Sequence, residues 1–129
     1  MRRLAFLLLS LFILTSGCVK QPEDLKVFLV NVSTDKTIYH SSELVNLSVV
    51  LDSNTGLKNV TVMVSGINGR LTEQKTLDLD KGSNNVQFTY TLPRCNVCGG
   101  ISAGMYDLTC VVSYGNKTLN GSVSIDIQQ

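Results

Sequence analysis

Alternation of apolar and polar residues runs through most of the chain and constrains its fold more than any other feature. Seven segments show this pattern, namely residues 28–32, 45–51, 60–64, 75–79, 86–92, 106–112 and 123–127. Because side chains of a β-strand point alternately to its two faces, each segment is predicted to be a strand with one apolar face. In the first segment Phe28, Val30 and Val32 share the face that should be buried.

Turn-forming residues separate these segments, and no stretch after residue 18 shows the periodicity of an amphipathic helix. Short antiparallel strands with one apolar face each cannot bury that face alone, whereas two stacked sheets can. The sequence therefore predicts an all-β fold, a seven-stranded antiparallel immunoglobulin-like (Ig-like) β-sandwich over residues 25–129.

Residues 1–17 predict an export signal ahead of the sandwich. Arg2 and Arg3 give a positive start, and residues 4–14 are almost wholly apolar. This run is shorter than the roughly 20 residues that cross a bilayer. Gly17-Cys18 resembles the lipobox of prokaryotic lipoproteins, which implies that the leader is removed and that Cys18 carries a lipid. An ordinary signal peptide with an incidental cysteine is the alternative.

Residues 18–24 would then form the lipidated cysteine and a short linker. At about 3.3–3.6 Å per residue, this linker reaches only roughly 20 Å. We therefore expect a domain anchored through Cys18 at the extracellular face of the cell membrane. A partner protein in the same membrane or envelope layer fits so short a tether.

Composition argues against nucleic acid as a partner. Only 16% of the residues are charged, and removing Arg2 and Arg3 with the leader leaves nine basic and ten acidic residues. A nucleic-acid-binding domain usually carries a basic stripe or patch, and this chain has none in its sequence.

Two local motifs resemble known Ig-like domains. Gly104-Met105-Tyr106-Asp107-Leu108 resembles the start of the sixth strand in many sandwiches, where the tyrosine makes a corner hydrogen bond. Thr34-Asp35-Lys36-Thr37-Ile38-Tyr39, followed by Glu43-Leu44-Val45, resembles the opening of macroglobulin-type domains and of related domains in prokaryotic surface proteins. The order of these motifs is similar to that of small archaeal lipoproteins. The thioester sequence of full macroglobulins is absent, so protease trapping is not implied.

The remaining cysteines divide into one core residue and one pair. Cys110 alternates with Leu108 and Val112, so it should be buried as a small hydrophobe. Cys95 and Cys98 fall in the long connection before the sixth strand, where an oxidising surface favours a local disulfide. The alternatives for this pair are thiol-redox activity or a metal site completed by His40. Otherwise His40 is expected to be a solvated loop residue, and no metal or other cofactor is predicted.

Five Asn-x-Ser/Thr sequons lie in the mature sequence, at Asn31, Asn46, Asn59, Asn116 and Asn120. All five project outward on the predicted strands, so each is a candidate glycosylation site in an organism that carries out this chemistry. Pairs of polar residues on any outer face would produce the same pattern without glycans.

The sequence contains little evidence of a catalytic site. A single histidine leaves no evident Ser-His-Asp set, and only Tyr39 and Tyr114 are expected to be exposed aromatic residues. We therefore predict a non-enzymatic domain that mediates protein contacts through residues 93–104 and the neighbouring residues 39–43. A thiol-redox or metal-handling lipoprotein that uses Cys95 and Cys98 is the alternative.

Overall fold

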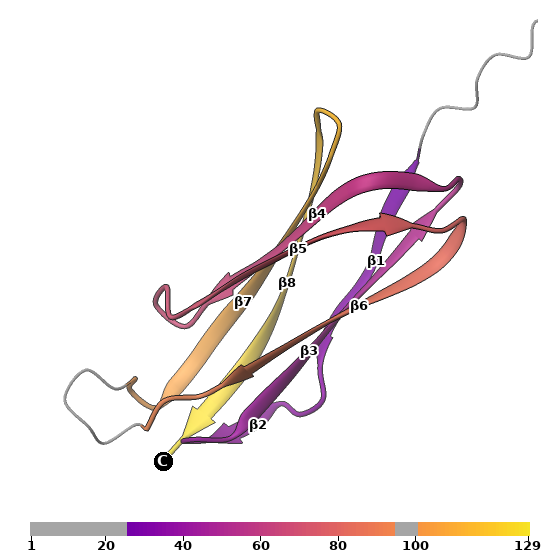
Figure 1. Cartoon of the computed structure of the whole chain (residues 1–129). Coiled ribbons are helices and arrows are strands. Elements are labelled where there is room, and N and C mark those ends of the chain that lie inside the picture. The colour runs from indigo at the N-terminus through magenta and orange to yellow at the C-terminus, as the bar shows by residue number, and fades with distance from the viewer. Residues whose placement is uncertain (1–25, 95–100) are drawn as a thin grey trace, which may run out of the picture.

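Two β-sheets packed face to face make up the domain in the computed structural model, which describes residues 26–94 and 101–129 (Figure 1). One sheet has the strand order β1-β3-β6 and the other β2-β8-β7-β4-β5. The strands are β1 (Val27–Thr34), β2 (Ile38–His40), β3 (Leu44–Ser53), β4 (Leu57–Gly66), β5 (Leu71–Leu79), β6 (Gly82–Thr91), β7 (Gly104–Tyr114) and β8 (Lys117–Gln128). The predicted all-β sandwich is confirmed.

The predicted count of seven antiparallel strands was wrong. The additional strand is β2, which pairs in parallel with β8 and joins the edge of the five-stranded sheet. Its three residues are too few to show a period of two. Parallel pairing arises because the chain leaves β1 in one sheet and crosses directly to the edge of the other.

The core lies between the inner faces of the two sheets and follows the predicted alternation in most strands. Its fully or almost fully buried side chains include Val45, Leu47, Val49, Leu51, Val60, Val62, Val64, Leu108, Cys110, Val112, Ile125 and Ile127. Burying one such aliphatic side chain contributes about 1.5–3 kcal/mol relative to its exposure. Most of the predicted inner faces are therefore correct.

The prediction for β1 was wrong at two positions. Phe28 and Val30 are exposed, and the residues that face the core are Val27, Leu29 and Val32. The pairing of β1 with β3 is irregular between Leu29 and Asn31, which marks a β-bulge. A bulge inserts one extra residue and shifts the alternation after it, so a strict period of two cannot describe the whole strand.

Two glycines allow close contacts between neighbouring elements. A Cβ atom at Gly66 would lie 2.8 Å from the Asp107 carbonyl oxygen, where β4 runs beside β7. A Cβ atom at Gly121 would meet the Leu29 side chain, where β8 packs on β1. The contact at Gly66 requires a residue without a side chain because a backbone atom cannot move away, whereas at Gly121 the Leu29 side chain would have to shift.

The strands run the length of the sandwich and give it two distinct ends. At one end, here called the entry end, the chain enters at Lys26 beside the turns at 54–56, 80–81 and 115–116 (Figure 1). At the opposite end, here called the network end, lie residues 35–43 and the end of β8. Across residues 26–94 and 101–129, no helix is long and apolar enough to cross a membrane.

Candidate functional site

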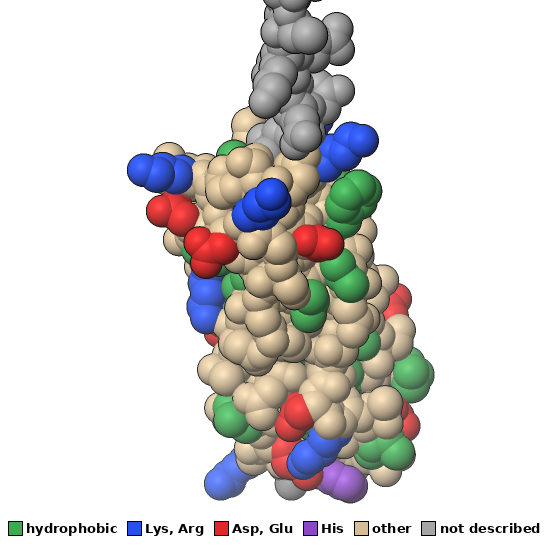
Figure 2. Space-filling view, turned by 90° about the vertical axis from the view of Figure 1, so that its right-hand side faces the viewer, with side chains coloured by type: hydrophobic (Ala, Val, Ile, Leu, Met, Phe, Trp, Pro, Cys, Tyr) green, Lys and Arg blue, Asp and Glu red, His purple; other side chains and the backbone are tan. Residues whose placement is uncertain are grey.

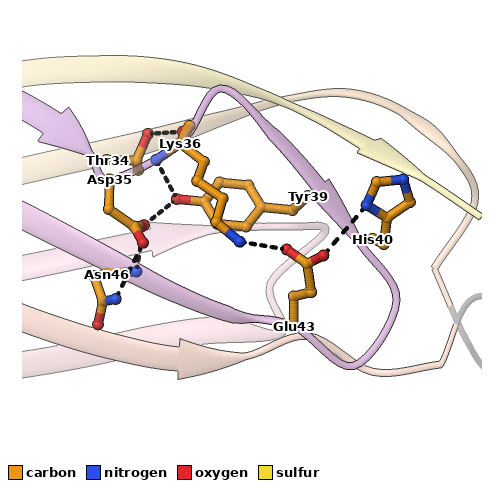
Figure 3. Close-up of polar contacts among 7 residues, drawn as sticks. All are labelled: Thr34, Asp35, Lys36, Tyr39, His40, Glu43 and Asn46. Carbon is orange, nitrogen blue, oxygen red and sulfur yellow. Dashed lines mark hydrogen bonds and ion pairs between the residues drawn. The ribbon is translucent and has the colours of Figure 1, made fainter.

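The network end is built from one short stretch of chain that crosses between the sheets twice. The chain leaves β1 at Thr34, joins the five-stranded sheet as β2, and returns to the three-stranded sheet as β3 at Leu44. Two such crossings within ten residues leave backbone and side-chain polar groups that need partners. The side chains of the Asp-Lys-x-x-Tyr motif supply these partners (Figure 3).

Asp35 is the centre of this network. Its carboxylate accepts a short hydrogen bond from the Tyr39 hydroxyl, and it also accepts bonds of 3.2 Å from the backbone N–H and from the side-chain amide of Asn46. The bond from Tyr39 is the main cause that lowers the pKa of Asp35 below its ordinary value of 3.8, and the Asn46 donors lower it further. Asp35 therefore ties β2 to β3 as a carboxylate.

Tyr39 is fully buried, and Tyr114 of β7 is also buried, in contrast to the predicted exposure of both. The Tyr39 hydroxyl donates to Asp35 and accepts the backbone N–H of Lys36 at 3.0 Å. Burial raises the pKa of Tyr39, and the hydrogen bond to the Asp35 carboxylate raises it further. The phenol therefore stays protonated at neutral pH, as a structural donor and not as a base.

Glu43 joins the remaining polar side chains at this end. Its carboxylate oxygens lie 3.1 Å from Lys36 Nζ and 3.2 Å from His40 Nδ1. The hydrogen bond from Lys36 is the largest cause that lowers the pKa of Glu43. The Lys36 ammonium also lies 5.8 Å from the centre of the Tyr39 ring. These exposed contacts fix side-chain positions and contribute little to stability, as is usual for surface ion pairs.

His40 is the last residue of β2, and not a loop residue as predicted, but its side chain is exposed as expected. In the part of the chain that the structure describes, no group of three or more His, Cys, Asp or Glu side chains could hold a metal ion. Each titratable group of the network already bonds a neighbour, and the arrangement contains no paired nucleophile and base. The bonds of Asp35 to Tyr39 and Asn46 join β2 to β3.

The segment that carries the cysteine pair begins and ends beside this network. The backbone N–H of Leu92 donates to the Glu43 carbonyl at 2.9 Å, and both Leu92 and Ile101 are buried. Gly104 and Tyr39 both pair with Ile127 of β8, so the two described flanks of residues 93–104 lie at the end of the sandwich that carries residues 39–43, as predicted. Cys95 and Cys98 themselves lie outside the described residues, as does Cys18.

The predicted tyrosine corner is present. The Tyr106 hydroxyl donates to the Ser102 carbonyl at 2.6 Å, which fixes the chain where it re-enters the sheet as β7. Farther along β7, Cys110 is a free thiol with no exposed surface, and burial raises its pKa to about 11. The prediction of a core cysteine is confirmed, and a thiol with so high a pKa is chemically inert at neutral pH.

The sequon asparagines do not share one environment. Asn31, Asn59, Asn116 and Asn120 are exposed, whereas Asn46 is half-buried and bonds to Asp35. Asn59 also has a positive φ of 59°, at an irregularity in the pairing of β4 with β5. Glycosylation of these sites stays a prediction.

The sequence did not reveal an exposed apolar row at the network end. Ile38 of β2 and Met105 of β7 both pair with Asp126 of the β8 strand between them. The three residues therefore form one rung on the outer face of the five-stranded sheet, with Ile38 46% and Met105 68% exposed. Tyr39 is buried, so its neighbour Ile38 points to the opposite, outer face of β2.

No protein-family model matches the chain, and no curated protein matches it in sequence. Solved structures do resemble it. The crystal structure of the CARDB domain of the PF1109 protein from Pyrococcus furiosus, in complex with di-metal ions, has a TM-score of 0.59 and 19% identity, with 81% of this chain and 88% of that chain covered. The solution structure of that CARDB domain has a TM-score of 0.54 and 18% identity, and the match covers 81% of this chain and 94% of that chain.

The chain has a CARDB-like fold. Spo0M, a sporulation control protein from Bacillus subtilis, is also similar, with a TM-score of 0.52, 16% identity and coverage of 81% of this chain and 49% of that chain. At such low identities the likeness concerns the fold alone, and it agrees with the predicted Ig-like β-sandwich.

Proposed function

We propose that this protein is a non-catalytic, lipid-anchored Ig-like domain at the extracellular face of the cell membrane, where it binds another envelope protein. The lipobox resemblance at Cys18 supports the anchor. Lys26, the first described residue, follows Cys18 by eight residues, or roughly 26–29 Å of extended chain. The entry end would therefore lie close to the membrane, and the network end would face outward.

The apolar row at the network end is the observation that carries the binding role. Ile38 and Met105 present exposed apolar surface on either side of Asp126, at the end farther from the anchor. Ile38 and Met105 offer apolar surface to a partner, and the carboxylate of Asp126 between them offers a group that a donor or cation of the partner can bind. The hydroxyl of Tyr39, the residue after Ile38, bonds Lys36 and Asp35, so the network fixes the position of β2 in this surface.

Site-specific photo-crosslinking in intact cells tests this role. A photoreactive residue at Met105 should crosslink one defined protein, and the I38D substitution should abolish that product. Thr118 provides the matched control, because it is exposed on the same strand-pair surface of β7 and β8 but at the entry end. Equal crosslinking from both positions, or substrate turnover by the purified domain, would contradict the proposal.

The alternative function is thiol-redox or metal handling by Cys95 and Cys98. Its support is the meeting of the described flanks of residues 93–104 with the segment that carries His40. The similar PF1109 domain was solved with two metal ions, but its likeness to this chain concerns the fold alone. Thiol titration with and without reductant, together with elemental analysis, separates the functions. A stable disulfide without metal would exclude this alternative.

A further inference from the structure

The entry end carries an apolar surface that the sandwich core does not use. Phe28 and Val30 are 59% and 61% exposed and are successive outward residues of β1. Hydrophobic side chains reach the surface in the upper part of the space-filling view, toward this end of the sandwich (Figure 2). Both residues point outward because they alternate with Val27 and Leu29, which face the core, and the bulge that follows leaves Val30 without a pairing partner in β3. Val50 of β3, which is half-buried, pairs with the next residue of β1 and extends the apolar surface.

Two hydrogen bonds of the Lys26 backbone fix the start of β1 beside this surface. The backbone N–H of Lys26 donates to Asn54 Oδ1, and the backbone N–H of Asn54 donates to the Lys26 carbonyl, both at 3.0 Å. These bonds hold the start of β1 against the turn at 54–56. Phe28 follows Lys26 by two residues, or about 7 Å along a strand.

We propose that the outer face of β1 at the entry end, with Phe28 and Val30, rests in the headgroup region of the lipid bilayer. This inference depends on the proposed anchoring at Cys18. The lipid would lie no more than roughly 26–29 Å of chain from Lys26, so the bilayer is the large apolar phase within reach of this face. Burial of Phe28 and Val30 at that boundary removes apolar area from water.

Charges beside the two residues favour a shallow contact. Lys26 lies at the edge nearest the anchor, where its ammonium can meet lipid phosphates. Asp52 is exposed and pairs with Phe28 across the ladder. A carboxylate in that position disfavours deep insertion, since an ionised group is costly in hydrocarbon. The face therefore suits the interface of the membrane and not its centre.

A second copy of the chain is the competing occupant of this face. β1 is an edge strand of its sheet, and an edge can pair with another edge. The bulge in β1 interrupts the regular row of backbone donors and acceptors that such pairing requires. For this reason we place the bilayer, and not a second copy, against Phe28 and Val30.

Tryptophan fluorescence can test the proposal cleanly because the chain contains no tryptophan. The lipidated F28W protein is reconstituted into phosphatidylcholine vesicles that contain a minor fraction of phosphatidylglycerol. The M105W protein is the matched control, since Met105 is also exposed but lies at the network end. We expect blue-shifted emission and quenching by brominated phosphatidylcholine for F28W, and neither effect for M105W.

The possible results of this fluorescence experiment distinguish the anchoring at Cys18 from the membrane contact of Phe28 and Val30. Protein that fails to float with vesicles would overturn the anchoring and this inference together. Protein that floats, but whose F28W emission matches that of M105W, would overturn this inference alone. A blue shift without vesicles that grows with protein concentration would show self-association and would also overturn it.

A glycan at Asn31 gives an independent test. Asn31 is exposed next to Val30, so a glycan there would hold this part of β1 away from the bilayer. We expect glycopeptide mass spectrometry of the native protein to find Asn31 unmodified, whatever the state of Asn116 and Asn120. Full occupancy at Asn31 would contradict the membrane contact.

Discussion

The two ends of this sandwich differ in the side chains that they carry and in what those side chains contact. At the network end, Tyr39 and Asn46 both donate hydrogen bonds to Asp35 and hold a chain that changes sheets twice. At the entry end, Phe28 and Val30 lie on the surface although both residues are apolar. The comparison of the two ends shows that a sequence motif, here Asp-Lys-x-x-Tyr, can serve to hold the fold together. Apolar residues that point away from the core, here Phe28 and Val30, can mark a surface that contacts another molecule or a membrane.

The largest effect is expected from removing the buried ring at the network end. We expect Y39A to lower the free energy of unfolding by about 3–5 kcal/mol, because it deletes a fully buried aromatic ring. Urea unfolding of the mature chain, followed by circular dichroism, measures this loss. Y39F keeps the ring and removes only the hydroxyl that bonds Asp35 and Lys36, so it should cost about 1 kcal/mol. Equal effects of both substitutions would contradict a packed Tyr39.

A smaller loss is expected where β4 approaches β7. A methyl group at Gly66 would meet the Asp107 carbonyl oxygen, which belongs to the backbone and cannot swing away. We expect G66A to cost about 1–3 kcal/mol, as is typical of overpacking. The control is G56A, because a Cβ there would lie at an ordinary 3.8 Å from its nearest neighbour. If both variants unfold at the same urea concentration, the close approach is wrong.

The network end should also make stability depend on pH. Hydrogen bonds lower the pKa of Asp35 and of Glu43 in the folded state, so their contribution is present above their ordinary values of 3.8 and 4.5. It is lost as the pH falls through the lower folded values. We therefore expect D35N to flatten the acid limb of the stability profile. The D52N control removes an exposed carboxylate at the entry end, and it should flatten that limb less than D35N does.

The smallest effect on stability is expected at the entry end. F28S and V30S remove exposed apolar side chains, so each should change the free energy of unfolding by no more than about 0.5 kcal/mol. The same substitutions should lower the protection of this face on vesicles, measured by hydrogen exchange of the lipidated protein. A large loss of stability in solution would show that the two side chains belong to the core.

The alternation of residues was enough to predict the fold class and the inner faces of the long strands, because a period of two relates directly to burial. It could not predict β2, which has only three residues, or the inner face of β1, where the bulge shifts the period. The tyrosine corner followed from a local motif. The network did not, since its bonds join residues through a change of sheet that the sequence alone does not show.

A lipid at Cys18 would place the entry end at the membrane, and intact mass spectrometry of the native protein can detect that lipid. We predict the mass of residues 18–129 plus a lipid group, with two hydrogens fewer where Cys95 and Cys98 are joined. A mass without lipid, or one that retains the leader, would contradict the account.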